Sequence, residues 1–245
     1  MRVQPHVVGS YMHVLKRGGR GMPIVKDEAD QYRFIRSLYY LNDTFVDENW
    51  DRASYNISYS GQTTVTRKGK LFYRPEHWPR RKELVKILGY TLMPNHLHLL
   101  LKEVVEGGIS LFMKKLGQSM TEHFNEKYVT RGSLFQGSYK GRTIDSDEYL
   151  RYVAAYIMVK NTFELFPGGI GKARENFEAA WQFSAKYPFS SFPDYVSERG
   201  SPIIDKEILG DLFSDKNEFK NFVRDVIDGG RWEKSHDPLA ALVIE

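Results

Sequence analysis

The chain has 245 residues, of which 41% are hydrophobic and 27% are charged, and its formal net charge is +4. This composition is that of a globular protein and excludes collagen-like, fibrous and disordered chains. The absence of cysteine excludes disulfides, zinc ribbons, iron–sulfur clusters and thiol catalysis, and it suits a reducing cytoplasm. No run of about 18 apolar residues occurs and polar residues stand close to the start, so we expect neither a membrane-spanning segment nor a secretory signal.

The charge is distributed unevenly along the chain. Residues 1–172 contain 26 Lys and Arg against 17 Asp and Glu, whereas residues 173–245 contain 9 against 14. The first part is therefore basic and the second part acidic. A basic surface attracts a polyanion such as nucleic acid, although a solvated surface with chance asymmetry is the simpler alternative.

Hydrophobic periodicity and turn residues divide the basic part into strands and helices. We expect strands over 7–16, 84–92, 95–103 and 139–144, and helices over 27–42, 109–127 and 147–165. The segment 45–83 is irregular, with short strand-like pieces at 56–60 and 63–66, and we interpret it as an insertion outside the core sheet. Pro94-Asn95 is a turn dipeptide and predicts a hairpin between the two middle strands.

The order of these elements is β-α-β-β-α-β-α, which is the split βαβ or ferredoxin-like arrangement of an α+β protein. We therefore expect an antiparallel sheet with flanking helices in a first domain over 1–172. Residues 173–245 are predicted to form an acidic, mostly helical C-terminal extension with an amphipathic stretch near 216–228.

The string from Leu92 to Leu101 contains two histidines separated by one residue. Alternate side chains of a strand point to the same face, so His96 and His98 project together while Leu97 faces the other way. Two adjacent imidazoles on a rigid strand can bind one divalent metal. Two half-buried histidines that are satisfied by hydrogen bonds are the alternative, because a metal needs further ligands.

The helix expected over 147–165 carries a second candidate, Tyr156. Lys160 lies four residues later and shares its helix face, and an ammonium beside a phenol stabilises the phenolate, which is a nucleophile. A core aromatic residue with a solvated hydroxyl is the alternative for Tyr156. Tyr152, one turn earlier on the same face, is the rival nucleophile.

Five strings occur together and in a fixed order in the basic part. They are YMHVLKRG (11–18), LMPNHLHLLL (92–101), FNEKY (124–128), GSLFQGSYK (132–140) and YI (156–157). Together they resemble the IS200-like single-tyrosine (Y1) transposases of the HUH superfamily, and among these the REP-associated tyrosine transposases. The resemblance covers residues 7–166, and the string SSFPDY (190–195) is similar to the same subgroup.

The resemblance implies a metal-dependent single-stranded DNA endonuclease and strand transferase, with residues 1–172 as a catalytic domain. His96 and His98 match the family's metal motif for Mg²⁺ or Mn²⁺, and Tyr156 matches the nucleophile that forms a 5′-phosphotyrosine link. The family commonly has Tyr-Ile-x-x-Asn-Pro at this place, whereas this chain has Lys160, then Asn161, and no proline. Asn161 is the candidate third metal ligand, displaced by one position, and Lys160 is a candidate for orienting the phosphate.

The same resemblance implies hairpin-forming repeats with a single-stranded flank as the substrate, and a monomer or homodimer in the cytoplasm, associated with the nucleoid. The residues expected to contact phosphates are Arg17, Arg20, Lys114, Lys115, Arg131, Lys140 and Arg142, with Tyr139 and Phe135 as candidate stacking platforms. For each basic residue taken singly, a solvated surface charge is the alternative.

Two other functions compete with a transposase. A domesticated relative that binds a hairpin without cutting it is favoured by the altered register of Lys160 and Asn161. An RNA-binding ferredoxin-like domain is disfavoured because the aromatic RNP pattern is missing.

Overall fold

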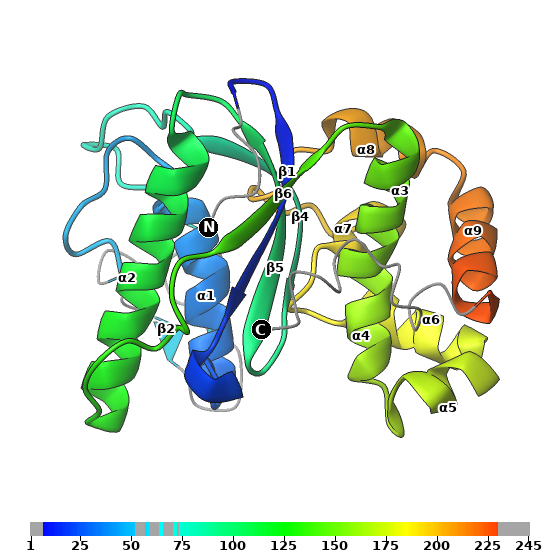
Figure 1. The fold of residues 1–245 in the computed structure, drawn as a ribbon. Coiled ribbons are helices and arrows are strands. Elements are labelled where there is room, and N and C mark those ends of the chain that lie inside the picture. Colours follow the sequence, from blue (N-terminus) through cyan, green and yellow to red (C-terminus); the bar gives the residue numbers. More distant parts are fainter. Residues whose placement is uncertain (1–6, 52–56, 59–63, 66–70, 73, 230–245) are drawn as a thin grey trace.

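A four-stranded sheet with a group of helices on each face makes up the described part of the molecule (Figure 1). The computed structural model describes residues 7–51, 57–58, 64–65, 71–72 and 74–229. The strands of the sheet are β1 (Tyr11–Arg17), β4 (Val85–Leu92), β5 (His96–Glu103) and β6 (Lys140–Ile144). A separate short pair consists of β2 (Ile57–Ser58) and β3 (Thr64–Val65).

Helices connect these strands and form the C-terminal extension. They are the 3₁₀ turn η1 (Gly19–Gly21), α1 (Glu28–Tyr40), α2 (Gly108–Tyr128), α3 (Asp147–Ala155), the π-helical turn η3 (Tyr156–Lys160), α4 (Asn161–Glu164), α5 (Gly169–Glu175), α6 (Phe177–Lys186), α7 (Phe192–Val196), α8 (Glu207–Leu212) and α9 (Lys216–Asp228). None of the described helices combines the length and the apolar character needed to cross a bilayer.

The first strand lies inside the sheet. The strand order is β4-β5-β1-β6, and every neighbouring pair is antiparallel. This order arises because α1 carries the chain from β1 to the edge strand β4, β5 returns as a hairpin beside β1, and α2 crosses to the other side of β1. The arrangement is the ferredoxin-like one, so the predicted α+β fold class is confirmed.

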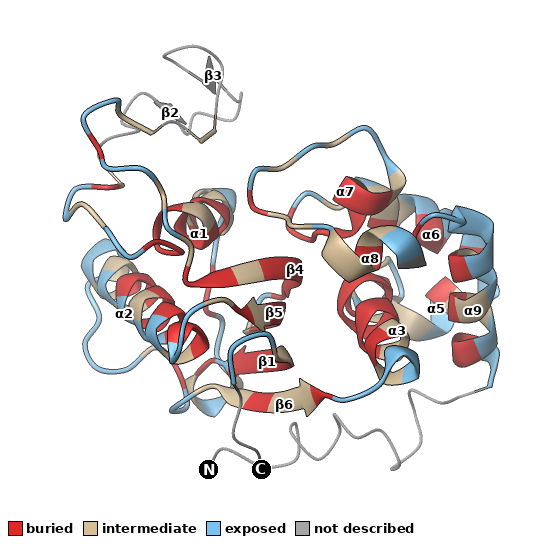
Figure 2. Ribbon diagram, turned by 90° about the horizontal axis from the view of Figure 1, so that it is seen from above, coloured by how far each residue is buried: buried red, intermediate tan, exposed pale blue. Residues whose placement is uncertain are grey.

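Side-chain alternation separates the two faces of the sheet. Leu97, Leu99 and Leu101 pack in a first core with α1 and α2. Leu100 packs in a second core with α3 and the C-terminal extension. Figure 2 shows α1 and α2 on one side of the strands and α3 on the other, with buried residues lining both interfaces. The sheet is therefore covered on both faces.

The C-terminal extension covers the outer edge of β4. The amide of Ser191 donates to the carbonyl of Tyr90 at 2.9 Å, and the hydroxyl of Tyr195 donates to the carbonyl of Leu88 at 2.6 Å. These bonds occupy main-chain groups that an exposed edge strand offers to other chains. The extension also supplies α9 side chains to the second core. The division of the chain at residue 172 stays a prediction.

The predicted insertion over 45–83 lies outside the sheet, but it packs back onto α1. Trp50 and Trp78 are buried in the first core, and their rings lie 5.5 and 6.1 Å from that of Tyr40. Of the strand-like pieces at 56–60 and 63–66, the structure describes the paired residues of β2 and β3, and the remainder falls outside the described residues.

Two other elements differ from their predicted bounds. The strand expected over 7–16 starts at Tyr11, because a turn with Gly9 at φ 90° precedes it. The helix expected over 147–165 is interrupted by η3, where hydrogen bonds span five residues in place of four. Hydrophobic spacing does not distinguish a single π turn from the α-helix around it.

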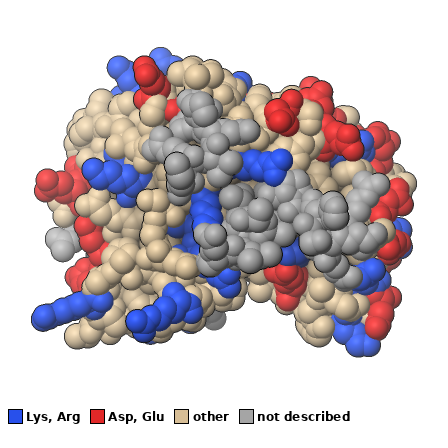
Figure 3. Space-filling view, in the orientation of Figure 1, with Lys and Arg blue, Asp and Glu red and all other residues tan. Residues whose placement is uncertain are grey.

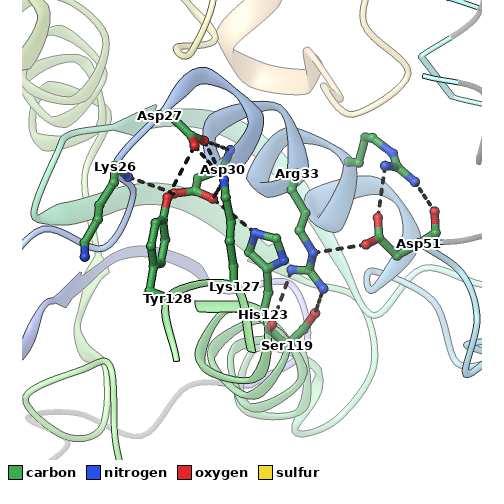
Figure 4. Close-up of polar contacts among 10 residues, drawn as sticks. Lys26, Asp27, Asp30, Arg33, Asp51, Ser119, His123, Lys127 and Tyr128 are labelled. Atoms are coloured by element: carbon green, nitrogen blue, oxygen red, sulfur yellow. Dashed lines mark hydrogen bonds and ion pairs between the residues drawn. The ribbon is translucent and has the colours of Figure 1, made fainter. Parts of the chain in front are cut away.

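A buried ionic cluster joins the start of α1 to the end of α2 (Figure 4). Asp30 is only 4% exposed and accepts hydrogen bonds from Lys127 Nζ, the Tyr128 hydroxyl and His123 Nε2. Burial by itself raises the pKa of Asp30, but these donors outweigh it and hold the pKa well below its ordinary value. The cluster therefore favours an ionised Asp30 and fastens the two helices to each other.

We expect Asp30→Asn to lower the free energy of unfolding at pH 7 by about 1–3 kcal/mol, because buried donors lose a charged acceptor. Urea denaturation measures this difference. Asp27→Asn is the control, since Asp27 is half-exposed and asparagine caps a helix as well as aspartate. The folded-state pKa of Asp30 is depressed, so its contribution is complete above an unfolded pKa of about 4 and is lost as the pH falls further. Equal stability of Asp30→Asn and wild type at pH 7 would contradict this role.

Candidate active site

Three histidines meet on one face of the sheet. His96 and His98 project from the same side of β5, and their ring centroids are 4.9 Å apart. His13 of the neighbouring strand β1 stacks on His98 with a centroid separation of 5.1 Å. The predicted alternation is confirmed, because Leu97 and Leu99 point into the core on the opposite face.

Tyr156, at the start of the π-helical turn, packs against these rings. Its ring centroid lies 5.5 Å from that of His98 and 6.1 Å from that of His13, and both contacts are edge-on. The residue is 5% exposed. Tyr152 is half-buried and packs on the second core. The fold thus brings the predicted nucleophile beside the predicted metal ligands.

Lys160 lies over the ring of Tyr156, with its Nζ 4.7 Å from the ring centre. The predicted proximity of these two residues is confirmed. The ammonium also forms an ion pair with Glu164, one turn later. A phosphate that approached Lys160 would therefore compete with a carboxylate, and the orienting role of Lys160 stays a prediction.

Asn95 determines which nitrogen of His96 carries the proton. Asn95 Nδ2 donates to the carbonyl of Gly21 at 3.2 Å, so its Oδ1 is the atom that faces His96 Nδ1 at 2.7 Å. A carbonyl oxygen only accepts, which places the proton on Nδ1 and leaves a lone pair on Nε2. Metal-binding histidines commonly have an acceptor behind the other ring nitrogen in this way.

His98 has a similar contact with His13, whose Nε2 lies 2.8 Å from His98 Nδ1. If His98 donates this hydrogen bond, its Nε2 keeps a lone pair for a metal. If His13 donates, His98 Nε2 carries the proton and cannot bind a metal. His13 Nδ1 is buried and has no hydrogen-bond partner among the described residues. The direction of this one hydrogen bond therefore decides whether His98 is a ligand.

Burial keeps the three imidazoles neutral near pH 7. It lowers the pKa of His13 to about 3 and that of His96 to about 4, and neighbouring cations add to both effects. The pKa of His98 is lowered in the same direction, again mainly by burial. Neutral imidazole is the form that binds metals, so protons compete little for these nitrogens at physiological pH.

The π-helical turn changes the place of Asn161. In an α-helix the residue four positions after Tyr156, which is Lys160, would bond to its carbonyl. Here the amide of Asn161 donates to the carbonyl of Tyr156, five positions earlier. The wider turn accommodates one extra residue in the helix. Asn161, the fifth residue after Tyr156, therefore occupies the place that the fourth residue after Tyr156 would occupy in a regular α-helix.

The side chain of Asn161 is buried at the end of the π-helical turn, close to strand β4. Its Nδ2 donates to the carbonyl of Ile157 at 3.4 Å, and the Thr91 hydroxyl donates to the same carbonyl. Thr91 is directly opposite His98 in the sheet. Within the described residues, Asn161 Oδ1 is buried without a hydrogen-bond partner. An amide oxygen is therefore available near the two candidate ligands.

Two imidazole nitrogens and one amide oxygen are thus the donors that this site offers a divalent metal. No group of three His, Cys, Asp or Glu side chains in the described part of the chain is arranged to hold an ion. A metal here would keep several positions for water or substrate oxygens, which a catalytic site requires. The donors fit Mn²⁺ through the nitrogens and Mg²⁺ through the oxygen.

Three of the predicted DNA-binding residues lie on the histidine face of the sheet. Arg17 is directly opposite His96, Arg142 is opposite His13, and Lys140 lies two residues before Arg142 on the same face. Figure 3 shows Lys and Arg side chains along the centre of one face of the molecule. All three residues therefore lie on the face that carries the histidines, and their contact with DNA stays a prediction.

The other predicted DNA-binding residues lie elsewhere. Arg20 is exposed in the 3₁₀ turn η1, Arg131 is exposed in a loop, and Lys114 is exposed on α2. Lys115 donates to the carbonyl of Asp43 at 2.7 Å, so its ammonium is engaged within the protein. The Tyr139 hydroxyl lies 3.1 Å from that of Ser110 on α2. The predicted set is therefore divided between the two faces of the sheet.

Phe135 is 4% exposed, and the ammonium of Lys16 lies 4.6 Å from its ring centre. The face that a stacked base would need is therefore taken by a side chain of the protein. This burial corrects the expectation that Phe135 is a stacking platform.

Sequence reasoning assigned no chemical role to His13 or Asn95. His13 alternates with apolar residues in the same way as His98, which is a usable signal. The contact of His13 with His98 could be known only from the strand order, which places β1 beside β5. Asn95 was expected as a turn residue, and its side-chain bond to His96 depends on the geometry of that turn.

Comparison with known proteins concerns the segment that carries this site. Residues 78–160 match the family model described as "Transposase IS200 like". Among solved structures, the chain is similar to one described as "Structure of the REP associates tyrosine transposase bound to a REP hairpin". The identity is 12% and the TM-score 0.44, over 83% of this chain and 90% of that chain. No curated protein matches the chain.

We expect the imidazole of His96 to titrate with a midpoint near pH 4 in NMR spectra of the metal-free protein. Arg17→Gln should raise this midpoint, because it removes a nearby positive charge. The folded protein binds this proton less readily than the unfolded chain. The resulting stability is therefore complete above about pH 6.5 and is lost as the pH falls toward 4. A midpoint near 6.5 would show that desolvation and the neighbouring cations do not lower the pKa of His96.

Proposed function

We propose that this chain, whose residues 78–160 match the family model of IS200-like transposases, is a metal-dependent endonuclease and strand transferase of single-stranded DNA. The observation that carries the proposal is the packing of Tyr156 against His98, beside His96. A nucleophile and two candidate metal ligands from separate elements converge there on one face of a rigid sheet.

Tyr156 would attack the scissile phosphorus through its hydroxyl oxygen. A Tyr–O–P bond forms, the bond from phosphorus to the 3′ oxygen breaks, the phenol gives up its proton and the 3′ oxygen takes one. A bound Mg²⁺ or Mn²⁺ would act as a Lewis acid on the phosphate oxygens. Because one phosphodiester replaces another, a free 3′-hydroxyl can reverse the step and rejoin strands without ATP.

The chain's own residues would position the phosphate. His96 and His98 would present Nε2, and Asn161 would present Oδ1. Arg17 lies opposite His96 at the end of β1 and would neutralise the attacked strand. Lys160 would leave Glu164 and hold a phosphate oxygen near Tyr156.

We propose hairpin-forming repeats with a single-stranded flank as the substrate. The support is the resemblance of the five strings between residues 11 and 157, taken together, and of residues 190–195 to the REP-associated transposases. The basic residues on the histidine face supply contacts that a phosphate backbone needs whatever its sequence. Action on chromosomal DNA implies a cytoplasmic protein at the nucleoid.

A non-catalytic hairpin-binding protein is the second candidate. It is favoured by the burial of Tyr156, which is 5% exposed, and by the ion pair between Lys160 and Glu164. Both features must change before a phosphate can reach the hydroxyl. The two candidates differ in one product, the covalent protein–DNA adduct.

Tyr156→Phe removes only the hydroxyl and keeps the ring packed on His98. We expect this variant to bind a labelled DNA hairpin with a single-stranded flank as wild type does, and to form no denaturation-resistant adduct in Mn²⁺. Tyr152→Phe is the matched control and should keep the adduct. A trapped peptide with the nucleotide on Tyr152, identified by mass spectrometry, would overturn the assignment. Wild-type binding without any adduct would favour the non-catalytic candidate.

His13→Phe keeps an aromatic ring and removes the acceptor for His98 Nδ1. We expect Mn²⁺ affinity, measured by electron paramagnetic resonance, to fall roughly 10- to 100-fold, as for other residues that orient a ligand. His96→Ala should lose still more, and it should leave hairpin affinity mostly intact because phosphates supply that energy. His77→Ala, at an exposed histidine, is the control. Unchanged affinity in a folded His13→Phe protein would show that His13 does not orient the ligand.

A further inference from the structure

A second candidate site lies on the opposite face of the sheet from the histidines. It is a pocket of about 490 Å³ between α2 and the loop that leads into β6. The lining residues that bear on its chemistry are Lys16, Lys114, Gly117, Glu122, Phe135 and Gly137. This volume is within the range of pockets that hold small ligands.

Lys16 is the least exposed charge in this lining. The residue is 9% exposed, and its Nζ donates to the carbonyl of Gly137 at 3.0 Å. Within the described part of the chain, no carboxylate forms an ion pair with it. An ammonium has three protons, so this group keeps donors for an acceptor in the pocket.

Holding this cation here is costly to the fold. Burial lowers the pKa of Lys16, which means that the surroundings disfavour its charged form. Gly117 lies under the side chain, and a Cβ at this position would be 2.8 Å from Lys16 Cε. Glycine inside a helix is destabilising relative to alanine. Helix α2 thus has a glycine, a residue of low helix propensity, at the position where the Lys16 side chain packs against it.

The pocket and the candidate active site lie at the same end of the sheet. Lys16 and Arg17 are consecutive residues of β1 and point to opposite faces, with Arg17 opposite His96. The loop that lines the pocket is tied to the end of β1, because Gln136 N donates to the carbonyl of Arg17 at 3.0 Å. A strand that turns around this end of the sheet would pass from one site to the other.

We propose that this pocket binds a nucleotide of the single-stranded flank of the DNA, with its phosphate on Lys16. The identity of the ligand as DNA rests on the proposed function, whereas the anion site does not. Lys114 at the rim adds a second positive charge, and Glu122 is the one acidic residue of the lining. A phosphate fits better than a stacked base, because the ammonium covers the ring of Phe135.

The test compares wild type with Lys16→Met, which keeps most of the apolar stem. Two labelled DNA hairpins are used, one with a single-stranded flank and one without, in EDTA so that no cleavage chemistry enters. For the flanked hairpin, we expect affinity to fall about five- to tenfold and the slope of log K against log salt to decrease in magnitude by about 0.7, the value for one phosphate of a single strand. Affinity for the blunt hairpin should stay the same. Lys172→Met, at an exposed lysine of α5, should change neither hairpin.

Thermal unfolding separates a binding role from a structural one. Replacing a buried cation by an apolar side chain is often neutral or stabilising, so Lys16→Met should keep or raise the melting temperature. Gly117→Ala is a second variant that displaces the Lys16 side chain, and it should weaken binding of the flanked hairpin while the helix gains alanine. A lower melting temperature with unchanged DNA affinity would make Lys16 structural and overturn the proposal.

The remaining outcomes distinguish the sources of the phosphate. If Lys16→Met binds the flanked hairpin with the wild-type affinity and slope, the pocket does not hold the flank. If inorganic phosphate raises the melting temperature of wild type but not of Lys16→Met, while DNA affinity is the same in both, the site binds a free anion and the DNA assignment is wrong. If wild type binds neither hairpin, the proposed function itself fails, which is a different result from failure of the pocket alone.

Discussion

The period of two along β5 is the constraint on which the candidate site depends. His96 and His98 share a face only because Leu97 and Leu99 are held in the core on the other face. A slip of one residue would place both imidazoles in the first core and turn Leu97 and Leu99 to the face that now carries the histidines. The turn before β5 opposes such a slip, since Met93 N donates to the carbonyl of His96 at 2.9 Å. The geometry of the candidate site and the packing of the first core therefore depend on the same register of β5.

Local periodicity made a large part of this structure predictable. The strand order followed from the order of elements, and the convergence of Tyr156 on the histidines followed from the family resemblance. The sequence did not reveal His13 as a neighbour of His98, because that contact depends on which strands are adjacent. The burial of Phe135 was also missed, since it depends on Lys16 crossing from β1 to the loop. The spacing of residues along the sequence could not predict contacts between elements that are far apart in the chain.

The π-helical turn connects a departure in sequence with a departure in backbone. Lys160 stands where the family has asparagine, and Asn161 follows one residue late. A turn that spans five residues compensates for that offset, because it advances the helix by one residue without shifting Tyr156. One inserted residue and one widened turn thus place an amide near the histidines. Such turns occur often at functional sites, where the lost α-helical hydrogen bond is tolerated for the position it gives.

Three features around this end of the sheet reduce stability. His13 Nδ1 and Asn161 Oδ1 are buried without partners among the described residues, and Lys16 is a buried cation without a described counter-ion. A fold optimised only for stability would not combine these features, since each buried polar group without a partner costs about 1–3 kcal/mol. Proteins accept such departures where a ligand supplies what is missing. A metal would use Asn161 Oδ1 and a phosphate would use Lys16, so a DNA strand in contact with both faces would satisfy these two groups.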